Sequence, residues 1–459
     1  MTSKSQNAKT TFILAFCLFF ANQSFAFEAG GHADPAAPIL LALIAILAVA
    51  KLGSEIFERL GQPAVLGELL GGVLLGNLIL INSAWGFFEP LRAATIQENW
   101  AVVIDSLARL GVIILLFEVG LESTVQGMMK VGASATLVAV LGVIAPFILG
   151  FGVSVIFIKE LPSELAATVP SGFNLNYVHL FIGAVLCATS VGITARVFKD
   201  LGKLQTKEAQ IILGAAVIDD VLGLIILAVV SGVITAAELG QPMDIGALLR
   251  LIGVAILFLG GSLALGVFLV PKIMKQLARL RTGGVMLISS LLFAFALSYL
   301  ANAAGLAAIV GAFAAGLILE EVHFHGFREE ITIEQLIKPI ATILVPIFFV
   351  LMGIQVRLET FANLSVLGVA GGLILAAIIG KQICSLGLLE KGLDRLTVGV
   401  GMIPRGEVGL IFAGIGKSLK VIDAATFSAV VIMVIVTTLI TPPILKLTLA
   451  RWEKRTAIR

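Results

Sequence analysis

Charged residues are scarce in this chain. Asp, Glu, Lys and Arg together make up only 13% of its 459 residues, whereas about a quarter is usual for a soluble domain. Hydrophobic residues make up 59%. Apolar segments long enough to cross a bilayer recur throughout the chain and leave no room for a soluble domain between them. The composition therefore excludes a soluble globular protein and predicts an all-α integral membrane protein.

Cysteine is rare as well, with three residues. Cys187 and Cys384 fall inside predicted spans, where a cysteine is usually a small hydrophobic residue, and Cys17 lies near the N-terminus. This number and spacing indicate neither a disulfide framework nor a metal centre, and we expect no cofactor. The net charge of +2 says little about partners. Among these we expect the lipid bilayer but no nucleic acid.

The first 26 residues differ from the rest of the chain. Lys4 and Lys9 precede a short apolar run over 11–21, and Ser24-Phe25-Ala26 places small residues at the two key positions before a cleavage site after Ala26. This order is typical of a secretory signal peptide, so we expect residues 1–26 to be removed. The alternative is an additional uncleaved helix, although the apolar run is short for a membrane span.

Beyond this leader we expect thirteen transmembrane helices. Lys and Arg are concentrated in the loops that follow odd-numbered spans. The positive-inside rule therefore places the mature N-terminus outside the cell and the tail 451–459 inside it. The expected spans are 38–57, 63–81, 101–121, 127–157, 178–202, 208–234, 245–273, 285–303, 306–319, 338–358, 364–389, 395–419 and 424–449.

Two of these spans contain residues that interrupt a helix. The fifth is interrupted over 188–194 and the twelfth over 399–407. Pro404 cannot donate a helical hydrogen bond, and glycines and hydroxyl residues favour unwinding. Each broken span is the middle member of a three-span group, 127–234 or 364–449, and the two run in opposite directions. Such a pair indicates an inverted-repeat transporter with its site near the middle of the membrane.

Five charged residues lie deep within these two groups: Asp219, Asp220, Lys381, Arg405 and Glu407. An ionisable residue at mid-span costs about 2.5 kcal/mol or more on insertion scales and usually marks an ion pathway. Neighbouring helical residues point about 100° apart, so one aspartate can face the pathway while the other takes a fixed partner such as Lys381. We expect Arg405 and Glu407 to neutralise the half-helix ends beside the break.

Motifs around these residues extend over most of the chain. They read ATSVGITAR at 188–196, IILGAAVIDDVLG at 211–223, GQPAVLGE at 61–68, LFEVGLE at 116–122 and MIPRGEVGL at 402–410. In combination they resemble the monovalent cation:proton antiporter-2 family. Asp219 narrows the resemblance to its electrogenic sodium/proton antiporters, since electroneutral members tend to have Asn at this position and glutathione-gated potassium efflux members tend to have Gln.

The resemblance implies an inverted-repeat antiporter fold with two crossed discontinuous helices, in a homodimer in the bacterial inner membrane with a periplasmic N-terminus. Asp220 would be the ion-binding aspartate, and Asp219 would pair with Lys381. Residues 37–125 and 278–360 would form a scaffold and dimer domain. Residues 127–234 and 364–450 would form the moving core, 245–275 a linker helix and 451–459 a cytoplasmic tail.

Several alternatives remain open at the site. The Asp219–Lys381 pair either takes part in the proton cycle or only braces the crossed helices. Thr189 and Ser190 either bind the transported ion or satisfy the broken backbone. Sodium is the expected cation at Asp220, with exchange against protons, and potassium/proton exchange is the alternative within the same class. Lithium transport is left open. A cation channel is the alternative from another class, since pores also use unwound helices.

Other titratable residues lie away from the broken spans. Glu68, Glu118 and Glu122 fall near predicted helix ends, where a side chain usually reaches toward the interface. His323 and His325 lie in an internal loop, either as a pH sensor or as solvated loop residues. An intramembrane aspartyl protease is excluded, because its two aspartates must face each other from different helices.

Overall fold

The computed structural model describes residue 34 and residues 36–92, 98–122, 132–161, 166, 173–203, 205–238, 245–277, 279–280, 282–304, 306–319 and 332–457. Within these ranges all regular secondary structure is helical. The expected signal peptide, His323 and His325 lie outside the described residues, and so do the side chains of Glu122 and Glu407.

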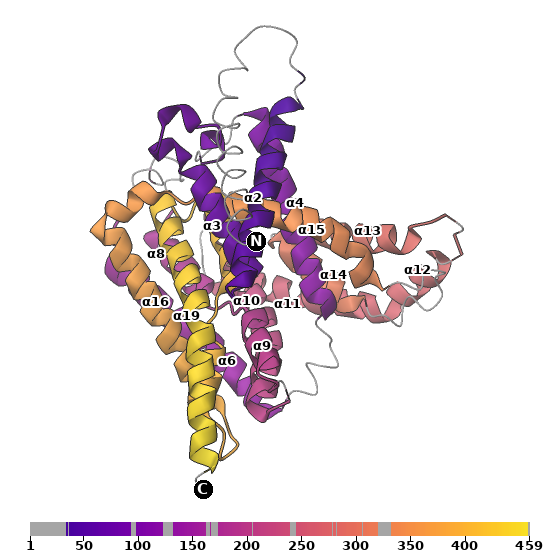
Figure 1. Cartoon of the computed structure of the whole chain (residues 1–459). Helices are drawn as coiled ribbons and strands as arrows, with labels where there is room; N and C mark the ends of the chain where they lie inside the picture. Colours follow the sequence, from indigo (N-terminus) through magenta and orange to yellow (C-terminus); the bar gives the residue numbers. More distant parts are fainter. Residues whose placement is uncertain are drawn as a thin grey trace, which may run out of the picture. The chain divides into compact units, whose positions relative to one another are not determined.

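The helices follow one another along the chain, and Figure 1 labels most of them. The α-helices are α2 (Ala37–Arg59), α3 (Ala64–Gly76), α4 (Asn99–Glu122), α6 (Ala133–Phe157), α8 (Leu175–Val185), α9 (Val191–Asp200), α10 (Lys207–Glu238), α11 (Ile245–Phe268), α12 (Val270–Leu277), α13 (Val285–Ala303), α14 (Ala308–Ile318), α15 (Ile333–Ile354), α16 (Leu364–Cys384), α17 (Arg395–Gly401), α18 (Gly406–Ser418) and α19 (Ala424–Ala457). Short 3₁₀ turns are η1 (Leu78–Leu80), η2 (Ser83–Trp85), η3 (Glu89–Arg92), η5 (Leu358–Ala362) and η6 (Ser385–Gly387).

Eight of the described helices are long and apolar enough to cross a membrane, and four shorter apolar helices accompany them. The chain is therefore an all-helical membrane protein.

Some element boundaries differ from the expected ones. The last helix continues to Ala457, beyond the expected end of its span, and the expected linker helix is divided at Leu269 into α11 and α12.

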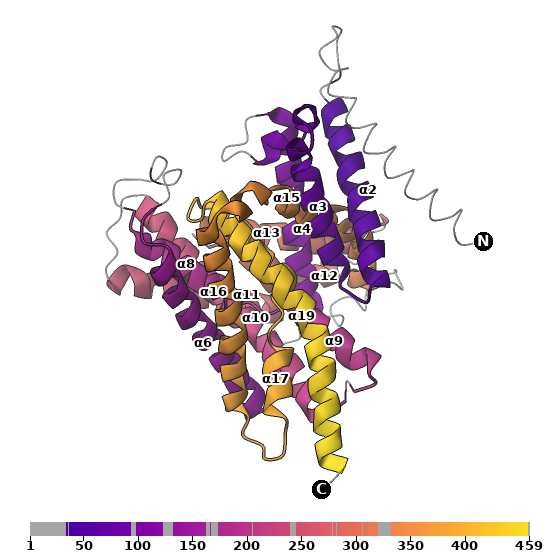
Figure 2. The same cartoon turned by 60° about the vertical axis from the view of Figure 1, so that its left-hand side comes forward.

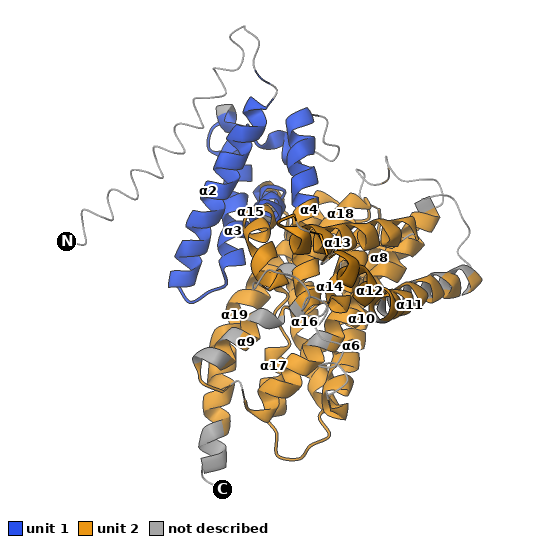
Figure 3. Ribbon diagram, turned by 90° about the vertical axis from the view of Figure 1, so that its right-hand side faces the viewer, with its two compact units in different colours: residues 1–109, 346–358 blue, residues 110–345, 359–459 orange. Residues whose placement is uncertain are grey.

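The described chain divides into two compact units, which Figure 3 colours separately. The first comprises Met1–Arg109 and Pro346–Leu358. In it, the hydroxyl of Ser54 on α2 donates a hydrogen bond to Glu68 on α3 at 3.0 Å, and Glu68 is only 9% exposed. The expectation that Glu68 reaches toward the interface is therefore wrong: a buried carboxylate needs a partner, and Ser54 provides one.

The second unit comprises Leu110–Val345 and Glu359–Arg459, and it holds both three-span groups. Helix α6 packs closely against α16, with Gly380 directly on Pro146. Helix α17 lies between α16 and α19, as Figure 2 shows. Buried side chains such as Val138, Ile212 and Val398 join α6, α10 and α17 in one apolar cluster. This packing holds the two broken helices.

Candidate functional site

Both interrupted spans are broken in the structure, over shorter stretches than expected. The first break lies between Val185 and Val191, so residues 191–194 are already helical. The second lies between Gly401 and Gly406, so Glu407 belongs to the following helix. Pro404 has no N–H for a helical bond. Gly406 has a φ of +35°, which a residue with a side chain rarely adopts.

The two breaks contact each other directly. The backbone N–H of Ser190 donates to the carbonyl of Pro404 at 2.8 Å, and the hydroxyl of Thr194 donates to the carbonyl of Gly401 at 2.6 Å. A Cβ atom at Gly406 would lie 2.4 Å from the hydroxyl oxygen of Ser190. The crossing therefore requires glycine at this position, and it satisfies part of the backbone that unwinding exposes.

Arg405 occupies the crossing point. Its side chain is completely buried, and Nη1 donates to the carbonyls of Ala188 and Cys187, the latter at 3.5 Å. These carbonyls follow the C-terminal end of α8, where a helix carries partial negative charge. The guanidinium therefore lies where it stabilises that helix end. Among the described residues, its Nε and Nη2 atoms have no hydrogen-bond partner.

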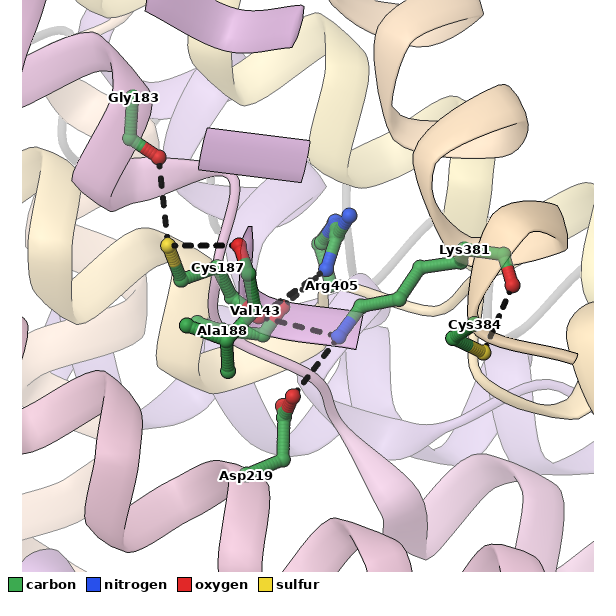
Figure 4. A network of polar contacts seen from close by, with 8 residues as sticks. All are labelled: Val143, Gly183, Cys187, Ala188, Asp219, Lys381, Cys384 and Arg405. Carbon is green, nitrogen blue, oxygen red and sulfur yellow. Dashed lines mark hydrogen bonds and ion pairs between the residues drawn. The ribbon is translucent and has the colours of Figure 1, made fainter. Parts of the chain in front are cut away.

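Lys381 and Asp219 form a buried ion pair beside the crossing. The Nζ atom of Lys381 on α16 lies 2.9 Å from Oδ1 of Asp219 on α10, and both side chains are 0% exposed. Nζ also donates to the carbonyl of Cys187 at 3.2 Å. Figure 4 shows the side chains of Lys381 and Arg405 both directed at the unwound stretch around Cys187. The second oxygen of Asp219, Oδ2, has no hydrogen-bond partner among the described residues.

Asp220 follows on the same helix, and its environment differs from that of Asp219. Asp220 is half-buried, whereas Asp219 is fully buried, as expected for side chains that point about 100° apart. In the first break, Thr189 and Ser190 are both 1% exposed. The hydroxyl of Thr189 has no hydrogen-bond partner among the described residues. The site thus contains carboxylate and hydroxyl oxygens, the ligand atoms that hard cations prefer.

Sequence motifs alone do not single out Cys187, yet its carbonyl is shared by Lys381 and Arg405. Its role could have been inferred from its place just before the break. Carbonyl groups at the end of a helix have no N–H donor from a following turn, so they accept hydrogen bonds from other groups. The thiol of Cys187 donates to the carbonyls of Gly183 and Val143, at 3.5 and 3.6 Å. The thiol is buried and packs between α6 and α8, as expected for a buried cysteine.

Two crossed broken helices beside a buried ion pair, in an all-helical membrane protein, are the features of a repeat-built secondary transporter. Comparison with known proteins agrees with this class. The chain belongs to the transmembrane sodium/hydrogen exchanger family, whose profile matches residues 39–451. The predicted membership among monovalent cation:proton antiporters is thereby confirmed.

The similar proteins match this chain over most of its length and of their own. A high-affinity Na+/H+ antiporter, NhaS3 of Synechocystis sp., is 41% identical over 436 residues, which cover 89% of each chain. The Na+/H+-K+ antiporter GerN of Bacillus cereus is 34% identical and covers 89% of this chain and 96% of its own. The structure of the sodium proton antiporter MjNhaP1 from Methanocaldococcus jannaschii matches with a TM-score of 0.63 at 19% identity, over 93% of this chain and 99% of that one. The last likeness shows the fold.

Proposed function

We propose that this protein is a secondary active antiporter that exchanges Na+ for H+ at Asp220 by alternating access. Family membership and the names of the similar proteins support antiport as the activity. The observation that carries the site assignment is the buried Lys381–Asp219 pair, which leaves the neighbouring Asp220 in a separate, half-buried position on α10.

The chemistry of exchange follows from competition for one carboxylate. Na+ prefers oxygen ligands, which Asp220, the hydroxyls of Thr189 and Ser190, and carbonyls of the unwound stretch supply, with water completing the shell. A proton on Asp220 removes the negative charge that attracts the cation. Each ion therefore displaces the other, and transport results when the loaded site opens alternately to the two sides.

Lys381 determines whether exchange moves net charge. If sodium entry separates Lys381 from Asp219, the released ammonium can give up its own proton, and two protons then move for each sodium ion. We propose this electrogenic cycle. In the alternative, Lys381 remains protonated as a brace and Asp220 alone carries protons. The complete burial of the pair is compatible with both cycles.

The finer architecture belongs to the same proposal. Thirteen spans would place the N-terminus in the periplasm and the C-terminus in the cytoplasm of a bacterial inner-membrane protein. The two three-span groups would form the moving core, and the remaining spans would form the scaffold of a homodimer. The signal peptide over 1–26 and the linker role of 245–275 are further parts of this arrangement.

Transport in proteoliposomes tests the proposal. The purified protein is reconstituted with a pH dye and a potential dye, and NaCl, LiCl or KCl is added in turn. We expect sodium to drive proton movement with a change in potential. A larger response to KCl than to NaCl would favour potassium/proton exchange, the alternative that is in line with the name of GerN, a Na+/H+-K+ antiporter. Sodium flux without proton movement would identify a channel instead. Electrogenic exchange of unchanged stoichiometry in Lys381→Ala would assign Lys381 to the brace.

A further inference from the structure

Helix α6 forms a third wall around the ion pair, in addition to α10 and α16. Gly142 on α6 lies at the point of contact. A Cβ atom built on Gly142 would lie 3.3 Å from Nζ of Lys381, 3.6 Å from Oδ1 of Asp219 and 3.4 Å from Cβ of Cys384. The space that a side chain would occupy at position 142 is therefore the space in front of the ammonium and its carboxylate.

The contact with Lys381 is the tight one. A carbon 3.3 Å from Nζ is closer than ordinary van der Waals contact, so the ammonium has to move by a few tenths of an ångström. Nζ is held on its other sides by Asp219 at 2.9 Å and by the Cys187 carbonyl at 3.2 Å. Small shifts matter here, because close-packed interiors do not deform freely.

The same stretch of α6 also has an altered hydrogen-bond pattern. Pro146 lies inside the helix, four residues after Gly142. Because proline has no N–H, the carbonyl of Gly142 lacks its usual helical donor. The next carbonyl, that of Val143, accepts from the thiol of Cys187, as Figure 4 shows. One turn of α6 thus lies against Lys381, at Gly142, and against the unwound stretch, at Val143. Lys381 itself donates a hydrogen bond to the same unwound stretch, at Cys187.

We propose that Gly142 is a positioning residue for ion exchange: its missing side chain leaves the space in which the Lys381 ammonium sits on Asp219 and from which it withdraws. This rests on the proposed function, because it assigns Gly142 to the same site. A methyl group at this position pushes the ammonium from its carboxylate. Asp219 is then less neutralised, and the site attracts sodium more strongly.

The test compares two alanine substitutions on one helix. Gly142→Ala introduces the methyl group at the pair. Gly152→Ala is the matched control, because a Cβ atom there meets nothing within 4 Å. For Gly142→Ala we expect the half-saturating sodium concentration to fall by about fivefold, which corresponds to about 1 kcal/mol of binding free energy. The pH profile of exchange should shift toward lower pH, because an ammonium held less tightly loses its proton more readily. Gly152→Ala should behave as the parent protein.

A double-mutant cycle identifies the partner of the methyl group. Thermal stability is measured for Gly142→Ala and Gly152→Ala in the parent and in a background that carries both Lys381→Met and Asp219→Ala, which leaves no buried charge unpaired. We expect Gly142→Ala to destabilise the parent but to cost no more than Gly152→Ala in the background without the ion pair. If Gly142→Ala does not fold, its recovery in that background supports the same contact.

Two results would overturn the inference: a parent-like sodium affinity and pH profile in Gly142→Ala, or an equal stability loss in both backgrounds. A parent protein that exchanges no sodium for protons would refute the proposed function instead, and the stability cycle would still report on the contact.

Discussion

Removing the carboxylate from Asp219 should destabilise the protein strongly, because it leaves the Lys381 ammonium buried without its counter-ion. Both side chains are 0% exposed, and breaking a buried ion pair by removing one partner costs about 3 to 5 kcal/mol. The remaining hydrogen bond to the Cys187 carbonyl, at 3.2 Å, offsets about 1 kcal/mol. We therefore expect Asp219→Ala to lower the apparent free energy of unfolding by about 2 to 4 kcal/mol.

The assay is unfolding of the purified protein in detergent micelles, followed by fluorescence. Asp105→Ala is the control, since it removes an ion pair with Arg109 in which Asp105 is 23% and Arg109 59% exposed. Exposed pairs of this kind contribute about 0 to 1 kcal/mol. Lys381→Met combined with Asp219→Ala should recover much of the loss, because an apolar pair leaves no buried charge. Equal stability of Asp219→Ala and Asp105→Ala, or a double variant weaker than Asp219→Ala alone, would refute this reasoning.

Two further substitutions test the crossing and the loop between η6 and α17. Gly406→Ala combines a φ of +35° with a Cβ contact of 2.4 Å to Ser190, so we expect a large loss of both stability and transport; Gly371→Ala, where a Cβ atom meets nothing within 4 Å, should leave both unchanged. Ser134 accepts from the N–H of Leu389 at 2.9 Å and donates to Glu390, and its hydrogen bond is the main reason why the pKa of Glu390 is lowered. A carboxyl group whose pKa is lowered in the folded protein stabilises the fold at pH values above its usual pKa, and this stabilisation is lost as the pH falls through the lowered pKa. Ser134→Ala should therefore destabilise the protein more at neutral than at strongly acidic pH. A loss of stability that grows toward acidic pH would contradict this.

The positions of the two breaks were largely predictable from the sequence, whereas their lengths were not. Pro404 and the hydroxyl and glycine residues mark the unwound stretches through their own backbone chemistry. Residues 191–194 are nevertheless helical, because tertiary packing overrides weak local preference. The proximity of Lys381 to Asp219 could be expected, since an isolated ammonium at mid-span needs a partner.

The features that escaped prediction depend on contacts between helices. The position of Glu68 near a helix end predicts a side chain at the membrane interface. In the structure Glu68 is buried and accepts a hydrogen bond from Ser54 on the adjacent helix. Gly142 looks like any glycine in an apolar span. Its contact with the ion pair depends on the axial position of α6 relative to α16. Hydrophobic periodicity gives the buried face of a helix, and it does not give that axial position.

The central claim is that one carboxylate, that of Asp220, binds the proton and the sodium ion in turn. The most direct measurement is sodium-dependent proton movement by Asp220→Asn in proteoliposomes, with the parent protein measured in parallel. Asparagine keeps the size of the side chain and removes its charge and its proton. We predict that the folded variant moves no protons when sodium is added. Exchange at the parent rate would contradict the assignment of the site to Asp220.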